Sequence, residues 1–134
     1  MNADGITPLI MALGRRESEM VKILIAHPRV DVNLPTPNKV TPLFLVCSQG
    51  YPDQAELLIG PQSPVRDKIK VNEDEVGESA LIGAVSKRSR EIVELLLQHP
   101  DIDVNITEKQ LGMTALYVAC EVFIASYFLC MVEY

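Results

Sequence analysis

The chain has 134 residues, of which 48% are hydrophobic and 22% are charged, so it has the size and composition of one folded domain and not of a disordered segment. Its net charge of −6 comes with no basic cluster, which argues against a nucleic-acid binder and weakly favours a protein partner with a basic surface. We identify no signal peptide in the first residues, and the three cysteines fit no metal-binding spacing, so we expect reduced thiols in a cytoplasmic or nuclear protein.

The first predicted element is a short helix that begins at Thr7-Pro8. A threonine hydroxyl can cap a helix, proline suits the first helical position, and apolar residues follow at helical spacing. A second helix is expected from Ser18, another capping residue, and it should end near His27, because the residue before Pro28 avoids the α region. The alternating segment 30–33 predicts an extended return.

The same order of elements recurs in two further full units and in a partial fourth. The later units begin at the cap-like residues Thr41, Ser79 and Thr114, so the four starts lie 34, 38 and 35 residues apart. Segments 26–33 and 98–105 are near copies of each other. This period predicts a two-helix unit that is repeated and stacked, and five extra residues near 61–68 predict a loop in the second unit.

Several short motifs recur in these units. A Thr-Pro-Leu triplet stands at 7–9 and 41–43, a glycine turn at 5–7, 77–79 and 112–114, and an Ile-Val-x-Leu-Leu-Leu core at 92–97. With these motifs the chain resembles the ankyrin repeat family. Residues of other types replace the family's signature histidine in every unit: Ile10, Phe44, Ile82 and Tyr117. In the second unit Lys39 replaces the turn glycine, and we expect the neighbouring Asn38 to tolerate a left-handed turn.

The resemblance implies the fold. We expect an all-α ankyrin-repeat solenoid, in which helix-turn-helix units stack and β-turn or hairpin loops join them. The chain would form one domain over residues 1–134, with repeats at about 2–33, 34–72, 73–105 and 106–134, the last of them divergent or truncated. Small residues on the first helices should allow close approach, and stacking should make the apolar core continuous.

The segment 122–132 departs from the pattern, because it is almost entirely apolar. Three interpretations remain open: a divergent last helix packed on the third unit, a piece of a longer array whose neighbour is missing, or membrane association. The last is the weakest, because a span of about 20 residues would have to include Glu121 and part of the fourth unit.

No residue pattern indicates catalysis, a cofactor or a metal. His27 and His99 occupy equivalent places two units apart, roughly 20 Å by helix spacing, so they cannot share a metal and we interpret them as contacts with helix C-termini. Cys47 and Cys120 also align, and we expect both to be small core residues. The carboxylates at 73–75 are expected in a solvated turn.

We therefore expect a non-catalytic protein–protein interaction module. The resemblance implies that a partner binds the concave side, at turn tips and at exposed positions of the first helices. Carried over residue by residue, these partner-binding positions are Asp4, Ile6, Arg15, Asn38, Val40, Ser48, Gln49, Glu75, Glu78, Lys87, Gln110 and Met113. The alternative is that the chain is a fragment, or a regulatory or targeting arm, of a larger ankyrin-repeat enzyme or membrane-associated protein.

Asn33, Asn72 and Asn105 end the return segments of the first three units. An asparagine there can hydrogen-bond its own backbone and fix a turn. The resemblance implies a second role, as substrates of a hydroxylating dioxygenase, so these three residues are also candidate modification sites.

Overall fold

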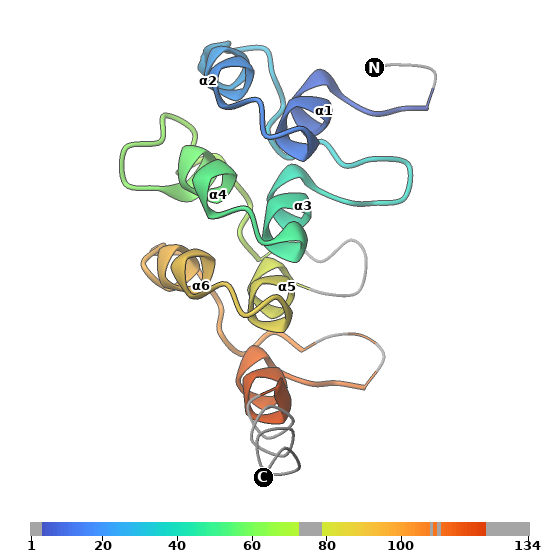
Figure 1. Cartoon of the computed structure of the whole chain (residues 1–134), viewed down its shortest axis with the longest axis vertical. Helices are drawn as coiled ribbons and strands as arrows, with labels where there is room; N and C mark the ends of the chain where they lie inside the picture. Colours follow the sequence, from blue (N-terminus) through green and yellow to red (C-terminus); the bar gives the residue numbers. More distant parts are fainter. Residues whose placement is uncertain (1–3, 73–78, 108, 110, 123–134) are drawn as a thin grey trace, which may run out of the picture.

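The computed structural model describes residues 4–72, 79–107, 109 and 111–122, and it shows a stack of helix pairs (Figure 1). The elements in chain order are α1 (Pro8–Gly14), α2 (Ser18–Ala26), α3 (Pro42–Gln49), α4 (Pro52–Ile59), α5 (Ala80–Ser86) and α6 (Arg90–Leu97), followed by the helical residues 115–122. The helices α1, α3, α5 and 115–122 form an inner row, and α2, α4 and α6 form an outer row. Within the described residues, the only β-type pairing is an isolated bridge between Thr107 and Thr114. The predicted all-α solenoid is confirmed.

The inner helices begin as predicted. In each, the hydroxyl of the cap residue accepts a hydrogen bond from the backbone N–H three residues later, at 3.2–3.3 Å. Such a cap satisfies one of the N–H groups that a helix leaves without a partner, and it is worth about 1 kcal/mol. The cap residues are Thr7, Thr41, Ser79 and Thr114.

The outer helix of the first repeat begins differently. Ser18 is the first residue of α2, whose cap is Glu17, and that cap makes no side-chain hydrogen bond. The Ser18 hydroxyl instead accepts a hydrogen bond from Nε2 of Gln54 in α4, 2.8 Å away. The prediction that Ser18 caps α2 is therefore wrong, because Ser18 is already the first helical residue and Glu17 precedes it as the cap.

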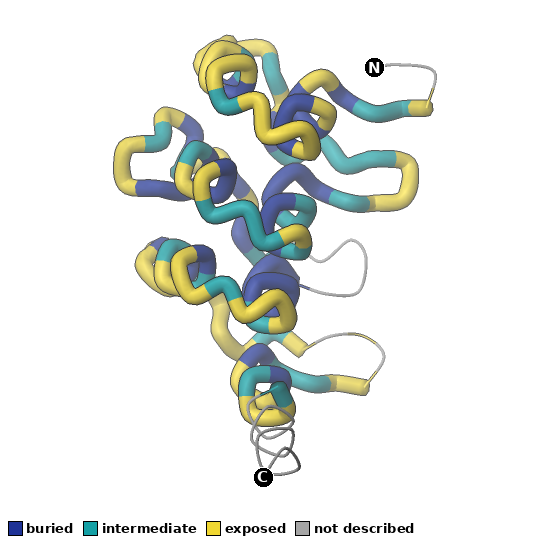
Figure 2. Tube along the Cα trace, in the orientation of Figure 1, coloured by how far each residue is buried: buried dark blue, intermediate teal, exposed yellow. Residues whose placement is uncertain are grey.

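The core lies between the two rows of helices and continues from repeat to repeat (Figure 2). The leucine of each Thr-Pro-Leu or Ser-Ala-Leu triplet in the first three repeats is almost fully buried: Leu9, Leu43 and Leu81. Burying one such side chain contributes roughly 2–3 kcal/mol. At Gly83 of α5 a β-carbon would lie 3.5 Å from the Phe44 ring of α3, which is ordinary van der Waals contact. The backbone of α5 thus lies against α3 with room for an alanine, and the role of small residues on the inner helices stays a prediction.

The five extra residues of the second repeat lie in a loop between α4 and α5, on the outer-helix side of the stack (Figure 1). The Ser63 hydroxyl donates to the carbonyl oxygens of Leu57 and Leu58 at 2.7 and 2.9 Å, which satisfies the C-terminus of α4. Val65 and Ile69 are buried, so this loop is anchored to the core.

The structure bears on the apolar tail only in part. In the described part of the chain, no helix is both long enough and apolar enough to cross a membrane. Residues 123–134 lie outside the described residues, so the three interpretations of the segment 122–132 stay predictions.

Candidate interaction surface

One row of exposed residues runs along the ends of the inner helices. Counting each repeat from its cap residue as position 0, Arg15, Gln49 and Lys87 all occupy position 8, and all three are exposed. The following residue has a left-handed backbone in each case, with φ of 58° at Arg16, 71° at Gly50 and 57° at Arg88. This shared turn redirects the chain from the inner helix into the outer helix, and it leaves the side chain at position 8 on the surface.

The second and third repeats lie close together at this edge. A β-carbon placed on Gly50, next to Gln49, would lie 3.6 Å from the β-carbon of Lys87 in the next repeat. The stack therefore brings together two turns that are 38 residues apart in the sequence.

Turn tips form a second row, on the side of the inner helices away from the outer helices (Figure 1). Asp4 and Asn38 are exposed there, and Ile6, Val40 and Met113 are half-buried. The predicted residues Glu75, Glu78 and Gln110 lie outside the described residues. The partner-binding role of the whole set stays a prediction.

The turn of the second repeat corrects one sequence inference. Lys39 itself adopts the left-handed conformation, with φ of 65°, and Asn38 does not take it over. The Lys39 N–H donates to the Thr36 carbonyl at 2.8 Å, and the Thr36 N–H donates to the Val40 carbonyl at 2.9 Å. These bonds fix the turn, so Lys39 bears the strain that glycine avoids at this place in Gly5 and Gly112.

Ser48 offers the least surface of the predicted residues on the inner helices. It is half-buried, and its hydroxyl donates to the Leu45 carbonyl at 3.1 Å. Its backbone nitrogen lies 3.5 Å from the place of a β-carbon on Gly83. Position 7 thus faces the next repeat, whereas position 8 faces solvent.

Charge differs between the two rows of helices. The turns that follow the inner helices carry cationic residues, namely Arg15 and Arg16 in the first repeat and Lys87 and Arg88 in the third. The outer helices carry acidic residues, among them Glu19, Asp53, Glu56, Glu91 and Glu94. Arg16 bridges the two sets, because its guanidinium lies 3.0 Å from the Asp53 carboxylate and over the Tyr51 ring.

Two of the three asparagines hold repeats together. The Asn33 amide donates to the Lys68 carbonyl at 2.8 Å and accepts from the Lys70 N–H at 2.9 Å. Asn72 makes the same pair of bonds to the return segment of the third repeat, with Asp101 and Asp103. The expectation that these side chains bond their own backbone is wrong for both. Aspartates perform that local role: Asp31 and Asp103 accept from the N–H two residues later.

The two equivalent histidines have different surroundings. His27 is exposed, whereas only 2% of the His99 surface is accessible. The Nδ1 of His99 accepts from the Asp101 N–H at 3.1 Å, and its Nε2 lies 3.0 Å from the Arg66 carbonyl. Because a backbone N–H can only donate, the ring proton sits on Nε2 and points at Arg66. The Arg66 guanidinium in turn donates to the Gln98 carbonyl at 3.0 Å.

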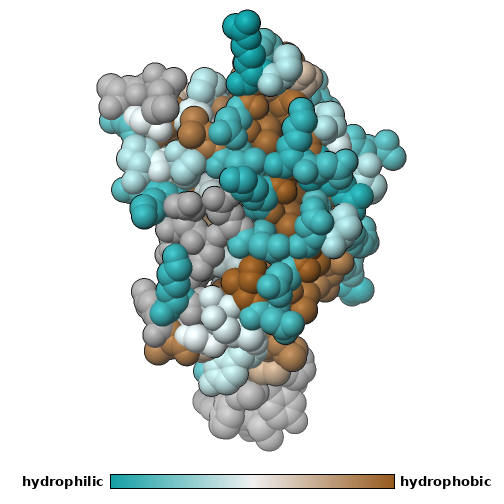
Figure 3. Space-filling model, turned by 180° about the vertical axis from the view of Figure 1, so that it is seen from behind, coloured by the Kyte–Doolittle hydropathy of each residue, from teal (hydrophilic) through white to brown (hydrophobic). Residues whose placement is uncertain are grey.

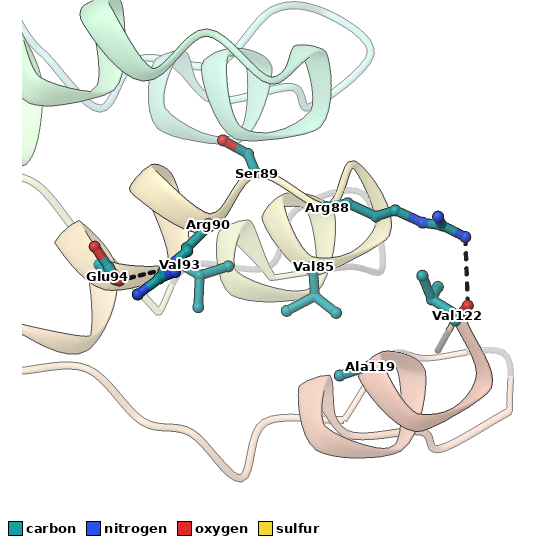
Figure 4. A pocket seen from close by; sticks show the side chains of 8 residues that line it. All are labelled: Val85, Arg88, Ser89, Arg90, Val93, Glu94, Ala119 and Val122. Carbon is teal, nitrogen blue, oxygen red and sulfur yellow. Dashed lines mark hydrogen bonds and ion pairs between the residues drawn. The ribbon is translucent and has the colours of Figure 1, made fainter. Parts of the chain in front are cut away.

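A groove of about 360 Å³ opens between the third repeat and the helix 115–122 (Figure 4). Its floor is apolar, with Val85, Val93, Ala119 and Val122. At the rim, Arg88 donates to the Val122 carbonyl at 3.3 Å, and Arg90 pairs with Glu94 at 2.8 Å. This lining suits apolar side chains and offers no nucleophile with an adjacent base.

Cysteine and metal chemistry find no further support among the described residues. Cys47 is fully buried, and burial raises the pKa of its thiol far above the ordinary range, so it stays protonated. Cys120 is exposed, contrary to its expected place in the core. The described segments contain no cluster of three or more histidine, cysteine, aspartate or glutamate residues that would hold a metal ion.

Comparison with family models decides the relationship. The model described as ankyrin repeats, in three copies, matches residues 1–69 and again residues 65–131. The chain belongs to the ankyrin repeat family. A search of curated proteins gives no match. Ankyrin repeats are in general protein–protein interaction modules, and the fold is typically non-enzymatic.

The rear face of this ankyrin stack shows apolar side chains in an interrupted band along its length, with polar side chains on both sides (Figure 3). Scattered apolar groups of this kind are normal on a protein surface.

The site residues that sequence reasoning missed are those that complete the contacts between repeats, above all Gln54 and Arg66. The near-copy segments 26–33 and 98–105 pointed to the histidines, but nothing in the sequence pointed to their partners.

Proposed function

We propose that this protein is a non-catalytic interaction module that binds a partner protein along the inner-helix ends and the turn tips. One observation carries the proposal: Arg15, Gln49 and Lys87 stand at the same position of three successive repeats and are all exposed. A rigid row of this kind can present several contacts at once without ordering a loop, which lowers the entropic cost of binding.

The charge of this row favours an acidic segment of the partner. Arg15 and Lys87 flank the neutral Gln49, and Arg16 and Arg88 follow them in the same turns. The net charge of −6 predicts that the protein as a whole attracts basic surfaces at long range, and this stays a prediction. At the row itself, Arg15 and Lys87 should bind acidic side chains of the partner.

The test is a comparison of binding by charge-reversed variants. The double variant Arg15→Glu/Lys87→Glu should lose the proteins that the wild type captures from cells that express it, because two favourable contacts become repulsive. The control Lys22→Glu/Arg90→Glu makes the same charge change on the outer helices and should retain them. Equal capture by both double variants would contradict the proposed surface.

The site of action that we propose is the cytoplasm, or the nucleus. The support is cysteine usage: Cys47 is a buried core thiol, and the described residues Cys47 and Cys120 are unpaired. Imaging of the tagged protein in its own cells checks this, and a signal confined to the secretory pathway would contradict it.

Among the three asparagines, we propose Asn105 as the most accessible to a hydroxylating enzyme. It is exposed, whereas Asn33 and Asn72 are half-buried and their amides bond the neighbouring repeats. Mass spectrometry of the protein from its own cells should then find any added oxygen at Asn105 before the other two.

A further inference from the structure

The inner helices contact each other through a fixed set of positions. A β-carbon on Gly83, at position 4 of the third repeat, would lie 3.5 Å from both the Phe44 ring and the Ser48 nitrogen, at positions 3 and 7 of the second repeat. A β-carbon on Gly14, at position 7, would lie 4.0 Å from Leu45, at position 4 of the next repeat. Position 4 therefore faces the preceding repeat, and positions 3 and 7 face the following one.

Exposure is greatest at the two ends of the described stack. At position 4, Gly83 and Val118 are buried and Leu45 is half-buried, but 36% of Met11 in the first repeat is exposed. At position 3, Ile10 and Ile82 are buried and Phe44 is half-buried, but 52% of Tyr117 in the last repeat is exposed. Among the described residues, no further repeat covers Met11 or Tyr117.

One further position extends the face of the first repeat. Met20, at position 13, is 47% exposed, although Gln54 and Ile92 at that position are fully buried. We name Met11 and Met20 the N-terminal end face, and Tyr117 and Glu121, at positions 3 and 7 of the last repeat, the C-terminal end face.

We propose that two copies of this chain stack head to tail, with the C-terminal end face of one copy on the N-terminal end face of the next. The second copy is the occupant because it carries the other half of a contact that the chain already makes between its own repeats. Charge agrees with this pairing. Glu121, at position 7 beside Tyr117, is exposed and anionic, and Arg15, at position 8 beside Met11, is exposed and cationic. Such a contact is heterologous and does not close on itself, so copies add in a row.

Sedimentation velocity of the whole chain tests the proposal. Between about 1 μM and 1 mM, the range expected for a weak interface, the wild type should sediment progressively faster as concentration rises. Met11→Asp and Tyr117→Asp should each sediment as a monomer, because each variant destroys one half of every contact. Both residues are exposed, and circular dichroism confirms that each variant folds. Gln62→Asp introduces the same charge in the exposed loop of the second repeat and should associate like the wild type.

A mixture of the two variants gives the decisive result. Met11→Asp keeps an intact C-terminal end face and Tyr117→Asp keeps an intact N-terminal end face, so an equimolar mixture should form a species of two chains and nothing larger. A wild type that stays monomeric over the whole range, as it would if another segment or protein covered Tyr117, overturns the proposal. So does a mixture that stays monomeric.

Discussion

The side-chain amide of Asn33 donates a hydrogen bond to the carbonyl oxygen of Lys68, 2.8 Å away, and so ties together two return segments that lie 35 residues apart. The same side chain accepts from the Lys70 N–H. The Asn33 side chain thus satisfies one backbone C=O and one backbone N–H of the return segment 68–70, groups that a neighbouring strand would satisfy in a sheet. Asn72 repeats the arrangement one repeat further along, so these bonds fix the register between repeats.

Replacing Asn33 by alanine should lower the free energy of unfolding by about 1–2 kcal/mol, because two backbone groups of the second repeat lose their partner. Urea denaturation measures the change. Asn105→Ala is the matched control, since Asn105 is exposed and no bridge of this kind is found for it in the described part of the chain. It should change stability by less than about 0.5 kcal/mol. Equal losses in the two variants would show that the bridge does not stabilise the stack.

His99→Phe should destabilise the protein more than His27→Phe, although the two histidines occupy equivalent places. Phenylalanine keeps a ring but removes both nitrogens, which leaves the Arg66 carbonyl and the Asp101 N–H without partners. We expect a loss of about 2–3 kcal/mol at His99. At His27, which is exposed and accepts one bond from the Arg29 N–H, we expect less than about 1 kcal/mol. The difference between their urea midpoints measures this, and a larger loss at His27 would refute it.

Local signals predicted the helices of this protein well. Caps, prolines and apolar spacing act within a few residues, and each predicted inner-helix cap is a cap in the structure. The periodic return of these signals indicated the stack. Ser18 shows where the local signal fails: the cap of α2 is Glu17, so Ser18 is a helical residue, and its hydroxyl accepts from Gln54 of the next repeat.

The polar contacts between repeats could not be predicted in the same way. Asn33 and Lys68, or His99 and Arg66, are more than 30 residues apart, and their meeting depends on the register of the stack. The histidines illustrate the point. Their sequence neighbourhoods are near copies, but only His99 has the loop of a preceding repeat against it, so only His99 is buried. Sequence likewise could not tell exposed Cys120 from buried Cys47, because the two align in the repeat and burial depends on packing against residues that are distant in the chain.

Lys39→Gly should raise the free energy of unfolding. The left-handed φ of 65° costs a residue with a side chain about 1–2 kcal/mol, and glycine removes that cost but loses part of the gain to the greater entropy of its unfolded chain. We expect a net gain of up to about 1 kcal/mol. Lys39→Ala is the matched control, because it removes the long side chain and keeps the strain. If alanine stabilises the protein as much as glycine does, the strain is not the cause.

Asp53 should make stability depend on pH in the acid range. Burial raises the pKa of this carboxyl, but hydrogen bonds from Arg16 and Gln54, together with the Arg16 charge, outweigh burial and hold the pKa below its ordinary value of 3.8. A group with a lowered folded pKa stabilises the protein above its unfolded pKa and loses that contribution as pH falls through the folded value. The contribution should therefore be complete above about pH 5 and disappear progressively below it.

Asp53→Asn removes the titrating group, so its unfolding free energy should fall less steeply than that of the wild type between about pH 5 and pH 2. The loss at neutral pH should stay below about 1 kcal/mol, because both partners are about half exposed and water screens the pair. Arg16→Gln should flatten the same part of the profile, since it removes the cation and keeps the carboxyl. Parallel profiles for the wild type and Asp53→Asn would contradict the lowered pKa of Asp53 in the folded protein.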